Sequence, residues 1–277
     1  MWYKKKITIE DAELEAKLLN FKPSDNLSSN SNICIYDLTN TDKTEQYRMY
    51  YSSNIQNNKV KYSTHIPNDL SIIQKKQQVI YIPNILYYKN NKGIIVMIEE
   101  HFTKSPQLNT MDERGILDLL IGMAKCVEFL HSYNIVHSRI WLNNFETNET
   151  NIIITDFSSC FSTSDFVVQK RVAGGIFSNR DAATFENNGD YTAPEVLSKE
   201  PYYNNRELLK KRDVFSFGIM LLDIIKHQPT HQITMTDKLL VTLYKIIVNC
   251  INFKPEERYT FTAIIKLLEL EKGEASF

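Results

Sequence analysis

The chain has 277 residues, of which 43% are hydrophobic and 23% are charged, and its formal net charge is −1. This length suits one large or two small domains with a sizeable core. The near-neutral charge gives no reason to expect nucleic acid or an anionic membrane as a partner. No apolar run is long enough to span a bilayer, and the start of the chain lacks the apolar core of a signal peptide. We therefore expect a soluble protein of the cytoplasm or another intracellular compartment.

The four cysteines point to the same kind of compartment, because they are far apart and form no CxxC pair. Zinc knuckles and the disulfide frameworks of small secreted domains need close, regular spacing. We expect reduced and mostly buried thiols at Cys34, Cys126, Cys160 and Cys250.

The first part of the chain, residues 1–32, is predicted to be an N-terminal helix followed by a linker. Residues 8–20 favour the helix, since Thr8 can cap it and apolar residues recur along it. Residues 22–32 are polar, with Pro23 and clustered Ser and Asn, which is typical of a linker.

Residues 33–102 predict a small unit rich in strands. A helix is expected at residues 69–78, between the third and fourth strands. The five expected strands are ICIYDL from residue 33, EQYRMYYSS from 45, KVKYST from 59, VIYIPNILYY from 79 and GIIVMIEE from 93.

Residues 103–277 predict a larger, mainly helical unit. Apolar residues repeat at helical spacing through residues 111–132. Residues 213–225 are apolar nearly all round, as in a buried central helix. Two amphipathic helices are expected at residues 238–251 and 260–270.

Five motifs in the large unit occur in an informative order. They are HSYNIVHSRIWLNNF, TDFSS, YTAPEVL, RDVFSFG and CINFKPEERYTF. Together they resemble the protein kinase superfamily over residues 33–270. The resemblance implies an α+β, bilobal kinase-like fold, with a small antiparallel β-rich N-lobe at 33–102 and a large mainly α-helical C-lobe at 103–277.

The resemblance also assigns roles to single residues. Asn144 and Asp156 match the asparagine and aspartate that hold Mg²⁺ on the nucleotide phosphates. The structural roles implied are contact of His137 with Phe157, pairing of Glu195 with Arg258, and anchoring of the catalytic-loop backbone by Asp213.

Several groups that move the phosphate are missing. Arg139 replaces the catalytic-loop aspartate, and an arginine cannot act as a base near neutral pH. Trp141 replaces the lysine that contacts the γ-phosphate. The first glycine of the chain is Gly93, so the first hairpin was expected to carry TNTDKTE, with Asp42 and Glu45, instead of a glycine-rich loop.

The nucleotide contacts of the small unit are also altered. Lys61, or else Lys59, is the candidate for the third-strand lysine, and no Glu occurs between Gln46 and Ile98 to pair with it. If ATP binds, the resemblance implies that Ile98 lines the adenine pocket and that the backbone around Glu99 and His101 forms the hinge.

From these losses we expect a pseudokinase that is not an enzyme, with no cofactor, which acts as a scaffold or allosteric regulator. Its partner would be another protein, such as an active kinase or a kinase substrate. Two alternatives remain open: an ATP-binding enzyme with weak or unorthodox phosphoryl or nucleotidyl transfer, and a module that keeps ATP as a structural ligand.

Overall fold

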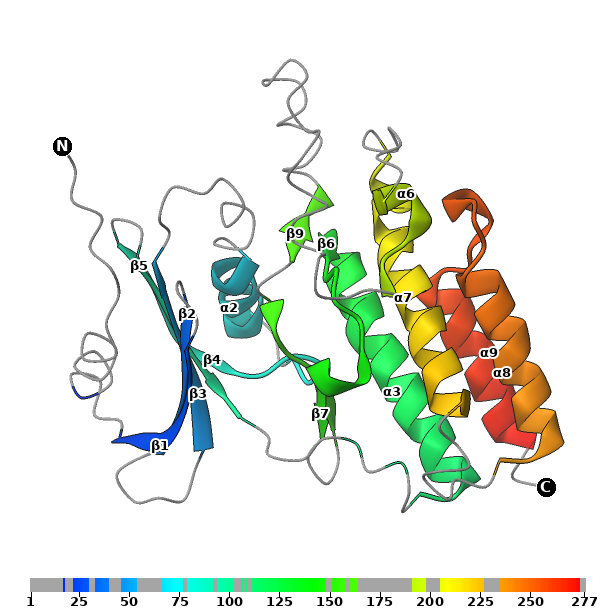
Figure 1. The fold of residues 1–277 in the computed structure, drawn as a ribbon, viewed down its shortest axis with the longest axis horizontal. Coiled ribbons are helices and arrows are strands. Elements are labelled where there is room, and N and C mark those ends of the chain that lie inside the picture. The colour runs from blue at the N-terminus through cyan, green and yellow to red at the C-terminus, as the bar shows by residue number, and fades with distance from the viewer. Residues whose placement is uncertain are drawn as a thin grey trace. The chain divides into compact units, whose positions relative to one another are not determined.

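The computed structural model of the chain is shown in Figure 1. The residues that the structure describes are 17, 22–29, 33–39, 46–53, 66–76, 79–91, 94–101, 106, 108, 111–147, 151–157, 160–163, 191–197, 205–226 and 235–274. The chain divides into two compact units, Met1–Thr103 and Lys104–Phe277, and each is described by itself.

The small unit contains a five-stranded antiparallel sheet in the order β1-β2-β3-β5-β4. Its core includes Leu38 of β2, Met49 of β3 and Ile98 of β5, each no more than 1% exposed. The strands are β1 Lys22–Ser29, β2 Ile33–Thr39, β3 Gln46–Ser53, β4 Ile85–Asn91 and β5 Ile94–Glu100.

One prediction for the start of the chain is wrong. The predicted linker forms β1, which pairs with β2 and shifts register between Pro23 and Leu27. β1 lies at the edge of the sheet, where a strand tolerates proline and polar residues. The strand predicted at KVKYST lies outside the described residues and stays a prediction.

Helix α2, Ile66–Lys76, lies beside β4. It corresponds to the helix predicted at 69–78, and it begins three residues earlier. Its buried residues are Ile66 and Leu70. The Gln74 side chain donates to the carbonyl of Pro83 at 2.7 Å and accepts from the Ile85 N–H at 3.1 Å. Because these bonds occupy the backbone before β4, the strand begins at Ile85 rather than at 79.

The large unit is built on four long helices that lie side by side in Figure 1. Helix α3 packs on α9, and α7 packs on α8. Asp112 caps α3 by accepting from the Gly115 N–H at 2.8 Å. The helices are α3 Glu113–Ser132, α7 Arg206–Lys226, α8 Asp237–Cys250 and α9 Phe261–Glu274.

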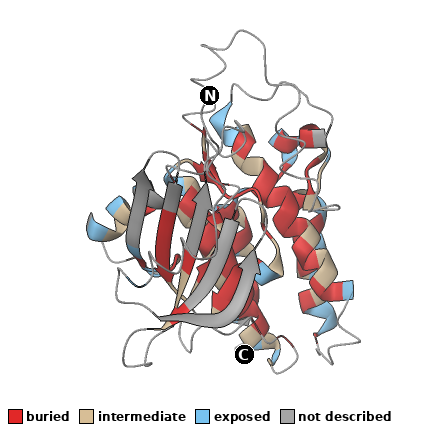
Figure 2. Ribbon diagram, turned by 60° about the vertical axis from the view of Figure 1, so that its left-hand side comes forward, coloured by how far each residue is buried: buried red, intermediate tan, exposed pale blue. Residues whose placement is uncertain are grey.

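The two central predictions for these helices are confirmed. The apolar stripe predicted along residues 111–132 is buried in α3. Helix α7 is buried nearly all round over its second half, and buried residues are red in Figure 2. It begins at Arg206 rather than at 213, because the charged residues on both sides of Leu208 and Leu209 mask the apolar signal of its first two turns.

Short elements connect the helices and carry the kinase-like motifs. β6 pairs with β9, and β7 pairs with β8, both antiparallel. They are β6 Ile135–Val136, η2 Leu142–Asn144, β7 Phe145–Thr147, β8 Ile152–Ile154, β9 Phe161–Ser162, α6 Pro194–Leu197 and η6 Pro255–Glu257. Among the described residues, no helix is long and apolar enough to cross a membrane.

We predict that Gly218→Ala destabilises the large unit by about 1–3 kcal/mol. A Cβ at Gly218 would lie 2.6 Å from Cβ of Cys250 and 2.9 Å from Cγ2 of Ile251, so α7 and α8 would have to separate. Urea unfolding of the full chain measures the loss. Gly273→Ala is the matched control, since its Cβ meets nothing within 4 Å; equal midpoints for the two variants would contradict the packing argument.

Candidate active site

The loop after β6 is anchored by the buried carboxylate of Asp213, which comes from α7. Oδ2 accepts from the His137 N–H at 2.8 Å and Oδ1 from the Ser138 N–H at 2.7 Å. His131, near the end of α3, approaches Oδ2 through Nε2 at 2.9 Å. Asp213 therefore joins α3, α7 and the loop, as the resemblance implied.

Two residues of this region are held in the left-handed backbone region. Ser138 has φ 68° and Asp156 has φ 61°. A residue with a side chain costs free energy there, and such strain persists only where the surroundings hold it. The Asp213 carboxylate supplies that restraint at Ser138 through its bond to the Ser138 N–H.

His137 lies fully buried beneath the loop. Its Nε2 donates to the Thr155 carbonyl at 2.9 Å, because a carbonyl oxygen can only accept. Burial lowers the pKa of His137 by disfavouring the imidazolium, against the opposing charges of Asp213 and Asp156. The ring packs edge-on to Phe157 with centroids 5.9 Å apart, which confirms the predicted contact.

Arg139 forms an ion pair with Asp156, the residue predicted to hold Mg²⁺. Nη1 of Arg139 lies 2.6 Å from Oδ2 of Asp156, and the two side chains are 24% and 25% exposed. Charge-assisted bonds between guanidinium and carboxylate are among the stronger polar contacts in proteins. The base position of the loop therefore carries a cation that neutralises the predicted metal ligand.

Asn144 and Trp141 complete this cluster. Asn144 Nδ2 donates to the Arg139 carbonyl at 2.8 Å, and its own carbonyl accepts from the Thr155 N–H at 2.9 Å. The Arg139 guanidinium lies 5.4 Å from the Trp141 ring centroid, within cation–π range. The structure thus brings Arg139, Trp141, Asn144 and Asp156 together on the large unit.

These residues do not fit a divalent metal. Mg²⁺ sites use oxygen ligands, mostly carboxylates, and one carboxylate oxygen of Asp156 already pairs with a guanidinium. The Arg139 guanidinium would also repel a metal ion at Asp156. Two unit charges 4 Å apart near a protein surface interact by about 4 kcal/mol, and Mg²⁺ carries two charges. No group of three or more His, Cys, Asp or Glu that could hold a metal occurs in the described part of the chain.

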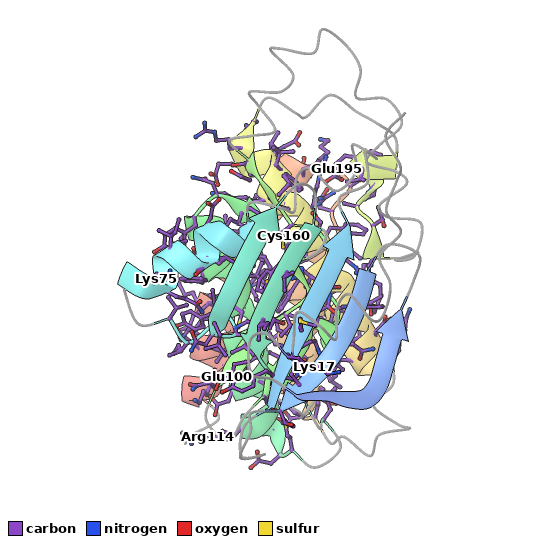
Figure 3. All side chains as sticks on the ribbon, turned by 90° about the vertical axis from the view of Figure 1, so that its left-hand side faces the viewer. Lys17, Lys75, Glu100, Arg114, Cys160 and Glu195 are labelled. Carbon is purple, nitrogen blue, oxygen red and sulfur yellow. The ribbon has the colours of Figure 1, made fainter. Side chains whose placement is uncertain are left out.

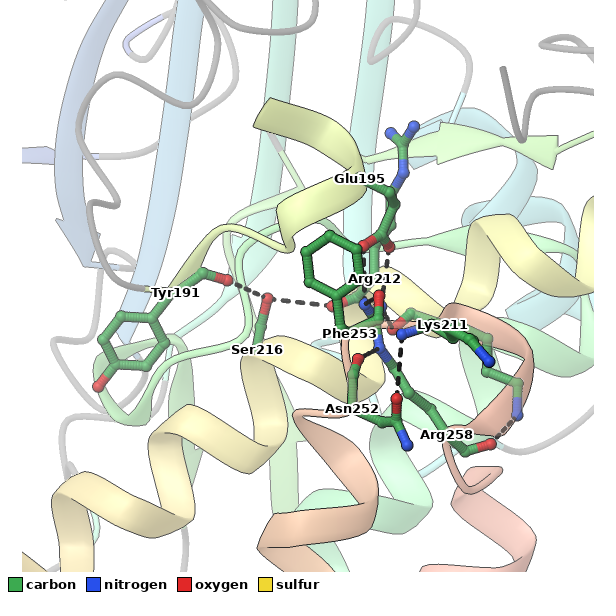
Figure 4. Close-up of polar contacts among 9 residues, drawn as sticks. Tyr191, Glu195, Lys211, Arg212, Ser216, Asn252, Phe253 and Arg258 are labelled. Atoms are coloured by element: carbon green, nitrogen blue, oxygen red, sulfur yellow. Dashed lines mark hydrogen bonds and ion pairs between the residues drawn. The ribbon is translucent and has the colours of Figure 1, made fainter. Parts of the chain in front are cut away.

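The pair Glu195–Arg258 joins α6 to the end of η6, and the pairing is as predicted (Figure 4). The guanidinium binds both carboxylate oxygens, at 2.8 and 2.7 Å, and both side chains are no more than 4% exposed. Arg258 also donates to the backbone carbonyls of Lys211, Asn252 and Phe253. The side chain of Ser216 on α7 donates to the Tyr191 carbonyl at 2.7 Å.

The described cysteines behave as the sequence predicts. Cys126, Cys160 and Cys250 are free and buried, and Figure 3 labels Cys160. Burial raises the pKa of all three thiols, that of Cys250 to about 12. Neutral thiols of this kind are poor nucleophiles, so none of the three is a candidate catalytic group.

The candidate nucleotide residues of the small unit are only partly described. Ile98 and Glu99 are buried in β5, and His101 follows that strand and accepts from Arg48 at 2.8 Å. Their contact with a nucleotide stays a prediction. Lys61 lies outside the described residues, whereas the third strand of the sheet, β3, contains no lysine.

The position expected for the glycine-rich loop was wrong by one connection. β1 pairs with β2, with Ser29 opposite Cys34, so these two strands form the first hairpin. TNTDKTE, with Asp42 and Glu45, connects β2 to β3 instead. The error follows directly from the missed β1. The turn of the true hairpin also contains no glycine.

Comparison with known proteins identifies the family. The family model of the protein kinase domain matches residues 33–268, and the chain therefore belongs to that family. It is 27% identical over 68% of its length to a probable serine/threonine-protein kinase of Dictyostelium discoideum, and 29% over 58% to a probable inactive serine/threonine-protein kinase of the same organism. The chain spans 19% and 14% of those two relatives.

A solved structure supports the fold alone. The structure titled titin kinase and its flanking domains superposes with a TM-score of 0.61 at 15% identity, and the match covers 94% of this chain and 48% of that one. The predicted kinase fold, with a small antiparallel sheet and a large helical part, is confirmed.

The prediction that the chain is not an enzyme is contradicted by these comparisons. The matched family and the first relative above are named as kinases, which are enzymes. The word "inactive" in the name of the other relative describes that protein. The loss of catalytic groups at single positions does not by itself show that a kinase domain lacks activity.

We predict that Glu195→Ala destabilises the large unit by about 3–5 kcal/mol, because Arg258 is then left buried and unpaired. Thermal unfolding of the full chain measures it. Glu257→Ala breaks the exposed pair with Lys254 and serves as the control, with little change in midpoint. A comparable loss in both variants would contradict a special role of burial.

We predict that the chain loses stability as the pH falls below about 6.5, the usual pKa of histidine. His137 is neutral when folded and gains a proton when unfolded, so its contribution is present above that pH and lost below it. His137→Gln keeps an amide donor and should flatten this slope. Unfolding at a series of pH values measures it; an unchanged slope would contradict the assignment.

Proposed function

We propose that the chain is an ATP-binding protein kinase domain with slow, unorthodox phosphoryl transfer to a protein hydroxyl. The observation that carries the proposal is the Arg139–Asp156 pair, which stands where a carboxylate base and a metal ligand usually stand. Membership of the kinase family supports the reaction class. The names of the relatives support a serine or threonine acceptor.

The step itself needs positioning and charge more than a base. The transition state of phosphoryl transfer spreads negative charge over the equatorial oxygens, and a fixed guanidinium stabilises such charge. The acceptor oxygen bonds to the γ-phosphorus, the bond from that phosphorus to the β-bridging oxygen breaks, and ADP leaves. The acceptor proton passes to water, since Arg139 cannot accept it.

The missing carboxylate base makes the expected rate low. A positioned general base typically contributes about 10²–10⁴-fold; Arg139 stands in the position of that base, and the nearby Asp156 carboxylate is paired with the guanidinium. Trp141, in the position of a phosphate-contacting lysine, removes a further charge. We therefore expect a low rate of phosphoryl transfer, because Arg139 and Trp141 stand in the positions of the base and of the phosphate-contacting lysine.

A second candidate is regulation of another protein through contact, as a scaffold or allosteric partner. It is favoured by the fully built framework of the large unit: Asp213 anchors the loop, and Glu195 pairs with Arg258. Such a framework presents a stable surface whatever the rate of transfer. The partner would be a protein, such as an active kinase or its substrate. An intracellular location is part of the proposal, supported by the free, buried cysteines.

Label transfer from γ-labelled ATP to a generic protein acceptor tests the proposal. We predict slow transfer above a protein-free blank, reduced about tenfold or more in Arg139→Ala, because a stabilising cation is lost. The control is Arg114→Ala: Arg114 is exposed in the first turn of α3, roughly 27 Å along the helix axis from the end of α3 nearest the loop.

Two outcomes contradict the proposal. Transfer that is equal in Arg139→Ala and in the unchanged chain would remove Arg139 from the reaction. No transfer above the blank, in a preparation that is folded by circular dichroism, would reject the enzyme and leave the regulatory candidate.

A further inference from the structure

We infer that Arg139 takes the place of a divalent cation on Asp156, so that the large unit binds the phosphates of a nucleoside triphosphate without Mg²⁺. The inference rests on the proposed function, because it concerns the nucleotide of that reaction. It begins from the 2.6 Å ion pair and from the poor fit of these residues to a metal.

The charges of the pair suit a polyanion. An unpaired Asp156 carboxylate would repel a triphosphate unless a cation lay between them. The Arg139 guanidinium supplies that cation within the chain. Its planar fork of N–H donors matches phosphate oxygens. The chain thus carries its own counter-ion at the position where kinases recruit one.

The guanidinium is held in place before any ligand arrives. The Arg139 carbonyl accepts from Asn144, and the guanidinium packs over the Trp141 ring at 5.4 Å. Asp156 restrains the other side of the cation. A side chain that is already ordered loses less conformational entropy when it binds, so this arrangement favours an anion more than a mobile surface arginine would.

The side chains of the Arg139–Asp156 pair are more exposed to solvent than those of the Glu195–Arg258 pair in the same unit. Arg139 and Asp156 are 24% and 25% exposed, whereas Arg258 and Glu195 are 0% and 4% exposed. A pair that only supports the fold can be covered completely, as Glu195–Arg258 is. The Arg139–Asp156 pair is open to solvent and therefore to a dissolved anion.

Mg²⁺ would have to displace Arg139 from Asp156 in order to bind there. Mg²⁺ would gain one carboxylate as a ligand, but Asp156 would lose its favourable contact with the guanidinium. The displaced guanidinium would stay nearby and repel the metal ion. Nucleotide binding is therefore expected to be indifferent to Mg²⁺.

The test uses Trp141 as the reporter. The chain has two tryptophans, so Trp2→Phe leaves Trp141, beside Arg139, as the only tryptophan, and excitation near the red edge of the absorption band selects its emission over that of tyrosine. In that full-length background, the emission is followed during titration with ATP, inorganic triphosphate and adenosine, each in EDTA and in Mg²⁺. We expect the affinity for ATP to differ by less than about threefold between the two buffers, and inorganic triphosphate to bind as well.

Two variants identify the residue responsible. Arg139→Ala should weaken ATP binding in EDTA by about tenfold or more, since a charge-assisted contact is lost, while Arg114→Ala should leave it unchanged. Arg139→Asp places a second carboxylate near Asp156 and should make ATP binding at least about tenfold tighter in Mg²⁺ than in EDTA. Circular dichroism checks that each variant is folded.

The outcomes separate this inference from the proposed function. ATP binding that requires Mg²⁺ in the unchanged chain and ignores Arg139→Ala would overturn the inference, while label transfer in the same preparation would leave the kinase proposal standing. Binding of adenosine but not of inorganic triphosphate would also overturn it. Absence of ATP binding in both buffers would reject both proposals together.

Discussion

The large unit depends on the buried carboxylate of Asp213. One side chain from α7 accepts two backbone N–H groups of the loop and meets His131 of α3. A buried carboxylate is costly unless its oxygens are bonded, and here the loop supplies the bonds. The loop in return holds Ser138 in a backbone conformation that it would otherwise avoid. Framework and site are therefore one network, and the site keeps its shape although its chemical groups have changed.

The exchange of aspartate for arginine at residue 139 changes the electrostatics of the site and leaves its geometry in place. Asn144 still binds the backbone of residue 139, and His137 still packs on Phe157. The guanidinium forms an ion pair with the carboxylate of Asp156. The same substitution thus removes a base and supplies a cation.

The sequence was most informative where apolar periodicity or a motif residue determines the local structure. Apolar periodicity located α3 and the buried half of α7, and the motifs located Asp213, Glu195 and Arg258 by role. The sequence did not predict β1, because this edge strand of polar residues has no alternating pattern. As a result, the expected position of the glycine-rich loop was wrong by one connection. The Arg139–Asp156 pair was missed because contact between residues 17 apart needs three-dimensional geometry. The only signal was a lost aspartate and a gained arginine facing a retained aspartate.

A double-mutant cycle of Arg139→Ala and Asp156→Ala on metal-free ATP affinity tests the central claim most directly. If Arg139 serves as the counter-ion of Asp156, removing the arginine exposes a repelling carboxylate. Its loss should then cost at least about threefold less affinity when Asp156 is already alanine. Equal costs in the two backgrounds would mean that the residues act independently, and would contradict the account.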